Sequence, residues 1–436
     1  MLSGIVQIAD VNDFINPNQS CVKPLLDKSS SSSSTKINLA DCLACSGCVT
    51  SAETILIQEH SLNKHFELSK DKFSVLLFSN QAIESLSNHY TISFQKCLEI
   101  VCSILKPDLI FNTDDINLYT LNLCYEEFIQ RKNSLICSEC PGWICYAEKK
   151  VGSIAFDFMS KVKSPQQILS IILRKMFQKV QIKNENIYIC SIMQCFDKKI
   201  ESVRNKNEIN CVLTPIEMQE SIDKMIKENQ ETVPFQSLTL TSFISLINEY
   251  LSNTSQTDTI LEYIKKHINP CTFSYPIYHS KENFSSNSYT EYFIYKILQD
   301  NPQFVVERNQ GKNIDIKEIN ILTDKKEPYA KFCIAYGFRN VQNIVRNLKR
   351  KKLVYDYIEL MACPGGCING GGQIRETIPR KLLTDISNKV NTDDKYCAPF
   401  KSESFKEIED ILNQEDKNKF IQTFHQIEFS MTDLKW

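Results

Sequence analysis

Residues 363–373 constrain the fold of this chain more than any other segment. They read Cys-Pro-Gly-Gly-Cys-Ile-Asn-Gly-Gly-Gly-Gln and contain five of the 11 glycines found among 436 residues. Because glycine has no side chain, this concentration predicts a backbone packed closely against another surface. The segment also carries Cys363 and Cys367, whose spacing lets two thiolates bind adjacent irons of one cluster. We therefore expect a buried loop that helps to hold a metal group.

Composition decides how the 18 cysteines are interpreted. Hydrophobic residues make up 42% of the chain and charged residues 23%, which predicts a folded globular protein. The net charge of −2 argues against chain-wide contact with nucleic acid or membranes. No apolar run reaches the ~18 residues of a transmembrane span, and the first residues lack the pattern of a signal peptide. We therefore expect a cytosolic or nuclear location, where clustered cysteines indicate metal ligands or catalytic thiols.

Three cysteines near the N-terminus, Cys42, Cys45 and Cys48, form a CxxCxxC motif. This spacing lets one tight loop place three thiolates around a single iron–sulfur cube. A four-iron cluster needs a fourth thiolate, and Cys21 is the nearest candidate outside the motif. The motif therefore predicts an iron–sulfur site in the N-terminal part of the chain.

Two histidines, His60 and His65, offer a zinc site as the alternative. Together with Cys42 and Cys45 they fit the loose spacing of a zinc finger. That site would leave Cys48 without a role, so we favour the iron–sulfur cluster. Both histidines are then interpreted as surface residues.

Strand-like and helix-like apolar patterns alternate after residue 72. Residues 73–78 and 187–192 predict buried strands, and residues 168–180 predict a helix between them. An apolar face within residues 340–352 predicts another helix, followed by a strand at residues 353–358. This alternation indicates an α/β fold with largely parallel sheets.

Two further cysteines each follow one of the apolar runs. Cys140 lies in a Cys-Pro-Gly-Trp segment after Leu135 and Ile136, and Cys195 follows the strand expected at residues 187–192. Both are thereby placed at the C-terminal end of a strand, where open α/β sheets carry their functional sites. Each cysteine taken alone is equally consistent with a buried structural residue.

Taken together, these segments resemble a known family. The Cys-Pro-Gly-Trp loop at Cys140, the Met-x-Cys-x-x-Lys-Lys loop at Cys195 and the glycine-rich loop at residues 363–373 resemble, in this order, the active-site loops of iron-only hydrogenases and their non-catalytic relatives. The chain resembles more closely the cytosolic iron–sulfur protein assembly factors of the hydrogenase-like, prelamin-A-recognition-factor-like type. Segments that resemble this subfamily are residues 13–15, 21–24, 41–53, 212–217 and 335–343.

The resemblance implies a two-lobed iron-only hydrogenase-like fold, with parallel sheets flanked by helices and a small N-terminal iron–sulfur module. We expect this module, with its serine-rich loop, at residues 1–66. The first lobe is expected at residues 67–160, joined by residues 376–425, and the second lobe at residues 161–375. Residues 426–436 would form a C-terminal tail.

The resemblance also implies two [4Fe–4S] clusters, each with four cysteine ligands. The first cluster would be held by Cys21, Cys42, Cys45 and Cys48. The second would lie between the lobes, held by Cys140, Cys195, Cys363 and Cys367. Lys198 stands where hydrogenases place a lysine beside their diiron subsite, and here we expect it to neutralise a negative cluster. The remaining cysteines are expected to be structural: Cys97, Cys102, Cys124, Cys137, Cys145, Cys190, Cys211, Cys271, Cys333 and Cys397.

Three departures from the hydrogenase pattern favour a non-catalytic assembly factor over an enzyme. Glu139 stands where catalytic hydrogenases carry a second cysteine that relays protons. Gln194 replaces the proline of another hydrogenase motif, and residues 285–289 lack the glycine expected at a helix start. We therefore expect no hydrogenase activity.

By this resemblance, the protein would work with upstream scaffold proteins and help to transfer iron–sulfur clusters to cytosolic and nuclear apoproteins. Two alternatives stay open at this point. One is a hydrogenase-type redox enzyme with a diiron subsite, and the other is a binding protein whose clusters are purely structural. Neither a nucleic acid nor a membrane is expected as a partner.

The C-terminal residues resemble a short docking motif. Leu434 and Trp436 match the hydrophobic–acidic–aromatic tripeptide by which clients and adaptors bind the cytosolic iron–sulfur targeting complex, which includes a WD40-repeat subunit. Lys435 departs from this pattern, because an acidic or small polar residue is usual there. A terminal ring folded onto the protein's own surface is the alternative interpretation.

Overall fold

The computed structural model describes most of the chain. The described residues are 57–204, 208–228, 231–232, 239–252, 259–267, 286, 289–374 and 405–426. Some residues singled out in the sequence lie outside these ranges, and they include Cys21, Cys42, Cys45, Cys48, Leu434 and Trp436. The N-terminal ligand set and the docking motif therefore stay predictions from sequence.

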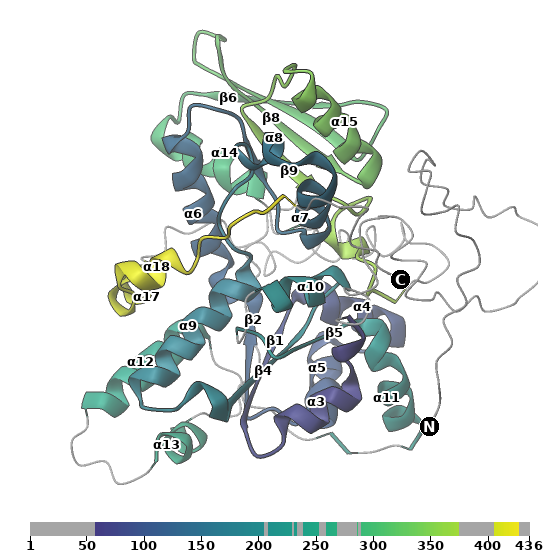
Figure 1. Cartoon of the computed structure of the whole chain (residues 1–436), viewed down its shortest axis with the longest axis vertical. Coiled ribbons are helices and arrows are strands. Elements are labelled where there is room, and N and C mark those ends of the chain that lie inside the picture. The colour runs from purple at the N-terminus through teal and green to yellow at the C-terminus, as the bar shows by residue number, and fades with distance from the viewer. Residues whose placement is uncertain are drawn as a thin grey trace, which may run out of the picture.

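Four parallel strands form the first sheet, in the order β2-β1-β4-β5. Every residue of these strands is buried, because helices cover both faces of the sheet (Figure 1). The strands are β1 Phe73–Phe78, β2 Leu109–Asn112, β4 Ile187–Ile192 and β5 Cys211–Leu213. One face packs against α3 Leu62–Ser69, α4 Asn80–Tyr90, α5 Phe94–Leu105 and α11 Pro215–Lys227. The other packs against α9 Pro165–Lys179, α12 Leu240–Ser252 and α13 Ile260–His267.

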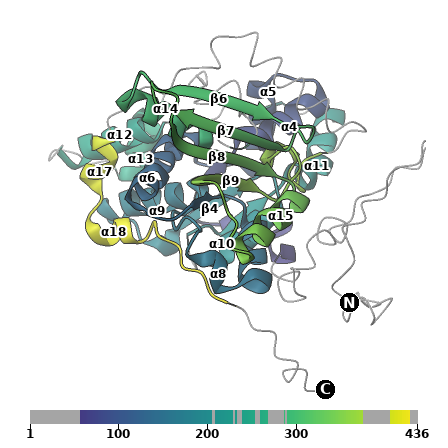
Figure 2. The ribbon, with the colours of Figure 1, turned by 90° about the horizontal axis from the view of Figure 1, so that it is seen from above.

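Five strands form the second sheet, in the order β3-β9-β8-β7-β6. Figure 2 shows β6, β7, β8 and β9 side by side. β3 pairs with β9 and β9 with β8 in parallel, whereas β8, β7 and β6 are antiparallel. This antiparallel edge is the exception within the largely parallel sheets that the sequence predicts, because short connections between β6, β7 and β8 permit only hairpins. The strands are β3 Leu135–Cys137, β6 Val305–Gln310, β7 Ile316–Leu322, β8 Pro328–Tyr336 and β9 Tyr357–Met361. Packed with this sheet are α6 Asn117–Gln130, α7 Pro141–Tyr146, α8 Ser153–Phe156, α14 Tyr289–Asp300 and α15 Phe338–Lys349.

Short elements connect these layers. α10 Asp197–Arg204 follows β4 and contacts α7 of the other sheet. α17 Lys406–Ile411 and α18 Gln414–Asn418 lie near the C-terminal end of the described chain, and this segment packs its apolar side chains into the core of the first sheet. The remaining turns are η2 Thr113–Ile116, η3 Ala147–Val151, η4 Asn184–Asn186 and η6 Cys367–Asn369.

The two sheets do not follow the lobe boundary expected at residue 160. β3 lies within residues 67–160 but belongs to the second sheet, while β4 and β5 lie within residues 161–375 and complete the first. The chain therefore crosses between the two sheets more than once. Local sequence patterns predict individual strands such as β1 and β4 but not their pairing, because pairing depends on contacts between residues far apart in the chain.

Several expected elements are confirmed by the structure. β1 and β4 have the bounds that the apolar runs predict, and α9 begins three residues earlier than expected, with Pro165 in its first turn. α15 buries Val341, Ile344, Val345 and Leu348, the predicted face. The strand expected at residues 353–358 is wrong in its bounds, because Val354 is 63% exposed and β9 begins only at Tyr357. Within the described residues, no helix is both long and apolar enough to cross a membrane.

Candidate metal centre

Strands from both sheets end at one cavity. β3 leads to Cys140, β4 leads to Cys195, and β9 leads to Cys363 and then Cys367. The cavity is partly open to solvent, and α7 and α10 lie at this junction between the sheets (Figure 1). It is lined by Glu139, Cys140, Pro141, Gln194, Cys195, Asp197, Lys198, Met361, Cys363, Cys367 and Gly370. The structure therefore brings together the four cysteines that the sequence assigned to the second site.

Local structure presents each of these cysteines to the cavity. Cys140 is the residue before α7, Pro141 occupies the first turn of this helix, and the Trp143 N–H donates to the Cys140 sulfur. Cys367 opens a short 3₁₀ turn, and its own backbone N–H donates to the Ser286 hydroxyl at 3.0 Å. Cys140 and Cys367 are buried, whereas Cys195 and Cys363 are half-buried. The thiols thus come from three separate chain segments but share one enclosed space.

The surroundings of the thiols favour protonation unless a cation is present. Burial raises the pKa of Cys140 to about 11, with a further contribution from Asp197. The backbone N–H groups of Ala362 and Trp143 donate to the same sulfur and oppose this shift. Burial also raises the pKa values of Cys195 and Cys367, and the neighbouring thiols add to it. A bound metal group would reverse this preference, because coordination favours the thiolate.

The glycine-rich loop packs against the segment that carries Cys195, as the sequence predicted. A Cβ atom added at Gly370 would lie 2.2 Å from the carbonyl oxygen of Gln194. The Gly372 N–H donates to that same oxygen at 3.0 Å. A Cβ added at Gly372 would come within 2.6 Å of Thr214 Cγ2, at the start of α11. The glycines are therefore needed to join loop 363–373 of one sheet to the strand ends of the other.

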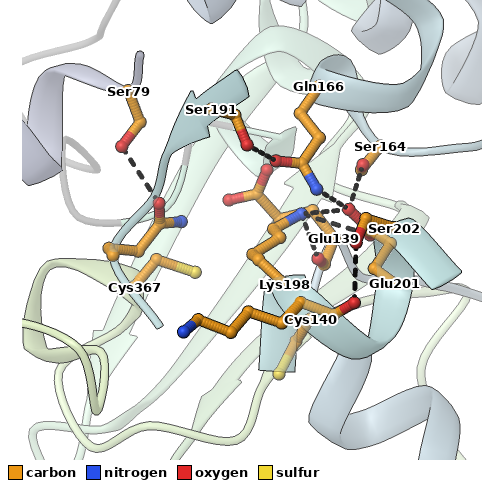
Figure 3. Close-up of polar contacts among 12 residues, drawn as sticks. Ser79, Glu139, Cys140, Ser164, Gln166, Ser191, Lys198, Glu201, Ser202 and Cys367 are labelled. Atoms are coloured by element: carbon orange, nitrogen blue, oxygen red, sulfur yellow. Dashed lines mark hydrogen bonds and ion pairs between the residues drawn. The ribbon is translucent and has the colours of Figure 1, made fainter. Parts of the chain in front are cut away.

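Lys198 is fully buried beside the cavity and is held by two groups. Its Nζ donates to the Glu139 carbonyl oxygen at 3.0 Å and lies 3.2 Å from both carboxylate oxygens of Glu201. Ser164 and Gln166 donate to the Glu201 carboxylate at 2.8 and 2.7 Å, as Figure 3 shows. The charge of Lys198 is thus balanced before any group enters the cavity.

The charge on Lys198 is retained despite its burial. Burial lowers the pKa of a lysine, but the Glu201 and Glu139 carboxylates outweigh this effect and raise it above its ordinary value. The thiolates of Cys195 and Cys367 would act in the same direction. Lys198 therefore stays charged, as one half of an ion pair with Glu201, beside four thiols that would become negative on binding a metal group.

Sequence reasoning missed the partners of this lysine. Glu201 follows Lys198 by three residues on α10, a spacing that brings side chains together on a helix and is visible in the sequence. Gln166 and Ser164 could not be found in this way, because they begin α9, which lies more than 30 residues away in the chain. Asp197 also lines the cavity, and its carboxylate would lie 2.8 Å from a Cβ added at Gly142.

The three departures from the hydrogenase pattern occupy defined positions. Glu139 is 4% exposed and lines the cavity. The Gln194 side chain accepts a hydrogen bond from the Ser79 hydroxyl at 3.0 Å, which connects the cavity wall to the start of α4. Ser286 accepts from the Cys367 N–H, so a serine hydroxyl anchors the loop where glycine was expected.

His60 and His65, expected at the surface, are both buried. Their exposed fractions are 7% and 1%. The prediction is wrong because both lie in the segment that covers the first sheet, where His65 hydrogen-bonds Tyr188 and the Leu105 carbonyl. Outward placement could be inferred from their polarity, but a histidine whose ring nitrogens are hydrogen-bonded is stable in a core.

The donor set suits a cluster better than a single ion. Among the described residues, no three His, Cys, Asp or Glu side chains lie close enough together to hold one metal ion. Four thiols spread around a cavity match instead a polynuclear group in which each thiolate binds its own iron. The backbone N–H groups on Cys140 Sγ are the donors expected around cluster sulfurs.

Residues 79–371 match the family described as "Iron only hydrogenase large subunit, C-terminal domain". The chain belongs to this iron-only hydrogenase-like family. Within the family, it is 32% identical to a Brugia malayi protein named "Probable cytosolic Fe-S cluster assembly factor", over 99% of this chain and 97% of that protein. An Anopheles gambiae protein with the same description is 30% identical, over 100% of this chain and 99% of its own length.

A solved structure of similar fold is an [FeFe]-hydrogenase from Chlamydomonas reinhardtii. It superposes with a TM-score of 0.62, covering 84% of this chain and 98% of that chain. At 16% sequence identity this likeness establishes the fold alone. The predicted iron-only hydrogenase-like α/β fold is therefore confirmed, as is the predicted family.

Proposed function

We propose that this iron-only hydrogenase-like protein is a component of cytosolic iron–sulfur cluster assembly and not an enzyme. The observation that carries the proposal is the cavity, which is lined by four cysteines and one buried, carboxylate-paired lysine. Relatives that match over the full chain are named as cytosolic Fe–S cluster assembly factors. In this role the protein would help to transfer clusters to cytosolic and nuclear apoproteins.

Cys140, Cys195, Cys363 and Cys367 would hold a [4Fe–4S] cluster in this cavity. When bound, such a group supplies iron bound to sulfide and thiolate, and thus either an electron carrier or a source of cluster. The chain's own residues determine its stability. The ammonium of Lys198, paired with Glu201, lies beside the thiols, the amides of Ala362 and Trp143 donate to Cys140, and the glycine-rich loop packs against the segment that carries Cys195.

A second [4Fe–4S] cluster would be held by Cys21, Cys42, Cys45 and Cys48, which lie outside the described residues. Their CxxCxxC spacing supports this assignment. The C-terminal Leu434 and Trp436 would bind the WD40-repeat subunit of the cytosolic targeting complex. One cluster would then lie between the two sheets, and the other would belong to the N-terminal part of the chain.

The hydrogenase-like fold keeps a redox enzyme as the competing function. Two observations argue against a redox enzyme. Glu139 stands in the place of the proton-relaying cysteine, and the ammonium of Lys198 is already paired with the Glu201 carboxylate. Infrared bands of carbonyl and cyanide ligands in the purified protein would support a diiron enzyme. Their absence, together with cluster transfer to an acceptor apoprotein, would support the assembly function over both the enzyme and a purely structural role.

Metal analysis of the full-length protein is the decisive experiment. After anaerobic reconstitution, iron, zinc and acid-labile sulfide are quantified and the reduced protein is examined by EPR. Two four-iron clusters predict about eight irons and about eight sulfides per chain, without zinc. About four irons per chain would show that one of the two cluster sites is assigned incorrectly. Stoichiometric zinc with little iron would overturn the proposal.

A further inference from the structure

A second pair of cysteines lies on the first sheet, away from the metal cavity. Cys190 on β4 and Cys211 on β5 are register partners in adjacent parallel strands. Both belong to the core that faces α3, α4, α5 and α11, and each residue is 1% exposed. Cys211 Sγ lies 4.0 Å from the Ser61 carbonyl oxygen, as a donor in a long contact, so the residue that precedes α3 covers this thiol.

The two thiols lie on adjacent strands in the same core but have different surroundings. The imidazole of His60 contacts Cys211, and its Nδ1 accepts a hydrogen bond from the Val212 N–H at 2.9 Å. Because Nδ1 is an acceptor, the proton of a neutral His60 lies on Nε2 and is available to the sulfur. Tyr188 borders both thiols and is itself held by His65.

The surroundings of the two thiols differ in their effect on acidity. The neighbouring Cys190 thiol is the main cause that lowers the pKa of Cys211 to about 5, against the effect of burial, and His60 adds to it. Burial, and after it the neighbouring Cys211 sulfur, raises the pKa of Cys190. A thiolate next to a thiol is the arrangement of reactive cysteine pairs.

We propose that Cys190 and Cys211 form a reversible redox pair that a peroxide oxidises to a disulfide. The Cys211 thiolate attacks one oxygen of hydrogen peroxide, and the O–O bond breaks. Hydroxide departs, and Cys211 becomes a sulfenic acid. The Cys190 thiol then attacks the Cys211 sulfur, so that an S–S bond forms, the S–O bond breaks and water leaves. The two sulfurs lose two electrons, which the peroxide gains, and a dithiol reductant reverses the change.

The position of the pair connects it to the metal cavity. Cys190 precedes Cys195 by five residues on the same chain segment, and Thr214, three residues after Cys211, packs beneath Gly372 of the glycine-rich loop. A disulfide would fix the two strands whose ends support that loop. Oxidation of the pair would therefore act on the strands that support the cavity without modifying the four cysteines that line it.

Peptide mapping of the full-length protein tests the proposal. The protein is exposed to hydrogen peroxide at a molar equivalent, with a chelator to bind released iron, then quenched with catalase, denatured and alkylated. Cys190 and Cys195 share the tryptic peptide 184–198, so fragment ions must locate the bond that joins it to peptide 207–224, which contains Cys211. We expect a Cys190–Cys211 bond that dithiothreitol removes.

Cys97 and Cys102 on α5 provide the matched control, because both are buried and both have raised thiol pKa values. We expect Cys211 to react at least about tenfold faster than either of them. In C190S the reaction should stop at a sulfenic acid on Cys211 that dimedone traps. Either of two results in the unmutated protein would overturn the proposal. One is a disulfide from Cys211 to Cys195 in place of Cys190, and the other is oxidation of Cys97 and Cys102 at the same rate as Cys211.

Discussion

Lys198 and Lys199 are consecutive residues of α10, yet their ammonium groups form hydrogen bonds in two different parts of the molecule. Lys198 Nζ donates to the Glu139 carbonyl at 3.0 Å beside the cavity lined by four cysteines, whereas Lys199 Nζ donates to the His60 carbonyl at 2.6 Å. Consecutive helical side chains point about 100° apart, which makes this division possible. α10 therefore connects the cavity to the segment that precedes α3.

Replacement of Lys198 by Met should destabilise the protein. Glu201 would then keep a buried carboxylate without its cation, and the loss of one partner of a buried pair typically costs about 3–5 kcal/mol. The double variant K198M/E201Q should recover much of this loss, because the amide that replaces the carboxylate carries no charge. Chemical denaturation of the three proteins measures the effect, and an equal loss in single and double variants would show that the charge pair is not its cause.

Replacement of Cys367 by Ala should remove the cluster from the cavity. The expected result is a loss of about four irons per chain and a lower unfolding midpoint, because a buried metal group contributes folding energy. C97A is the control, since Cys97 is buried on α5, away from the cavity, and its iron content should not change. Full iron content in C367A would show that the ligand assignment is incorrect.

Gly370→Ala tests the contact between the two sheets. The new Cβ would lie 2.2 Å from the Gln194 carbonyl oxygen, which belongs to the backbone and cannot rotate away. We expect a loss of about 3 kcal/mol in the free energy of unfolding, at the upper end of overpacking effects. Gly311→Ala is the matched control, because no heavy atom lies within 4 Å of the added Cβ. Equal stability of the two variants would contradict the close packing of the loop.

Trp436 provides the test of the docking motif. Its removal should weaken binding to the WD40-repeat subunit at least roughly thirtyfold, since a buried aromatic anchor is typically worth ~2 kcal/mol or more. Both clusters should remain, because no cysteine is altered. Calorimetric titration of the two proteins measures the difference. Unchanged affinity of the shortened protein would refute the motif.

The sequence was sufficient for the elements that depend on local pattern. The apolar runs located β1 and β4, and the glycine concentration predicted the close packing that Gly370 shows. It was insufficient where the outcome depends on distant contacts. The partners of β3, the burial of His65 against Tyr188, and the approach of Gln166 to Glu201 all join segments that no local pattern connects.

The pH dependence of stability should report the buried carboxyl of Glu359. Burial raises its pKa from about 4.5 to about 7, although Thr290 and Tyr336 donate hydrogen bonds to it. Between these two values the folded protein binds the proton more tightly than the unfolded chain does. The contribution of this group is therefore complete below pH 4.5 and is lost as the pH rises to about 7.

Glu359→Gln should remove this dependence, because the amide does not titrate. The difference between the two pKa values corresponds to about 3 kcal/mol. Relative to the unmutated protein, E359Q should therefore gain about that much stability between pH 4.5 and about pH 8, whatever its stability at the lower pH. Urea denaturation at a series of pH values measures the change. A constant difference between the two proteins across this range would show that Glu359 stays ionised in the fold.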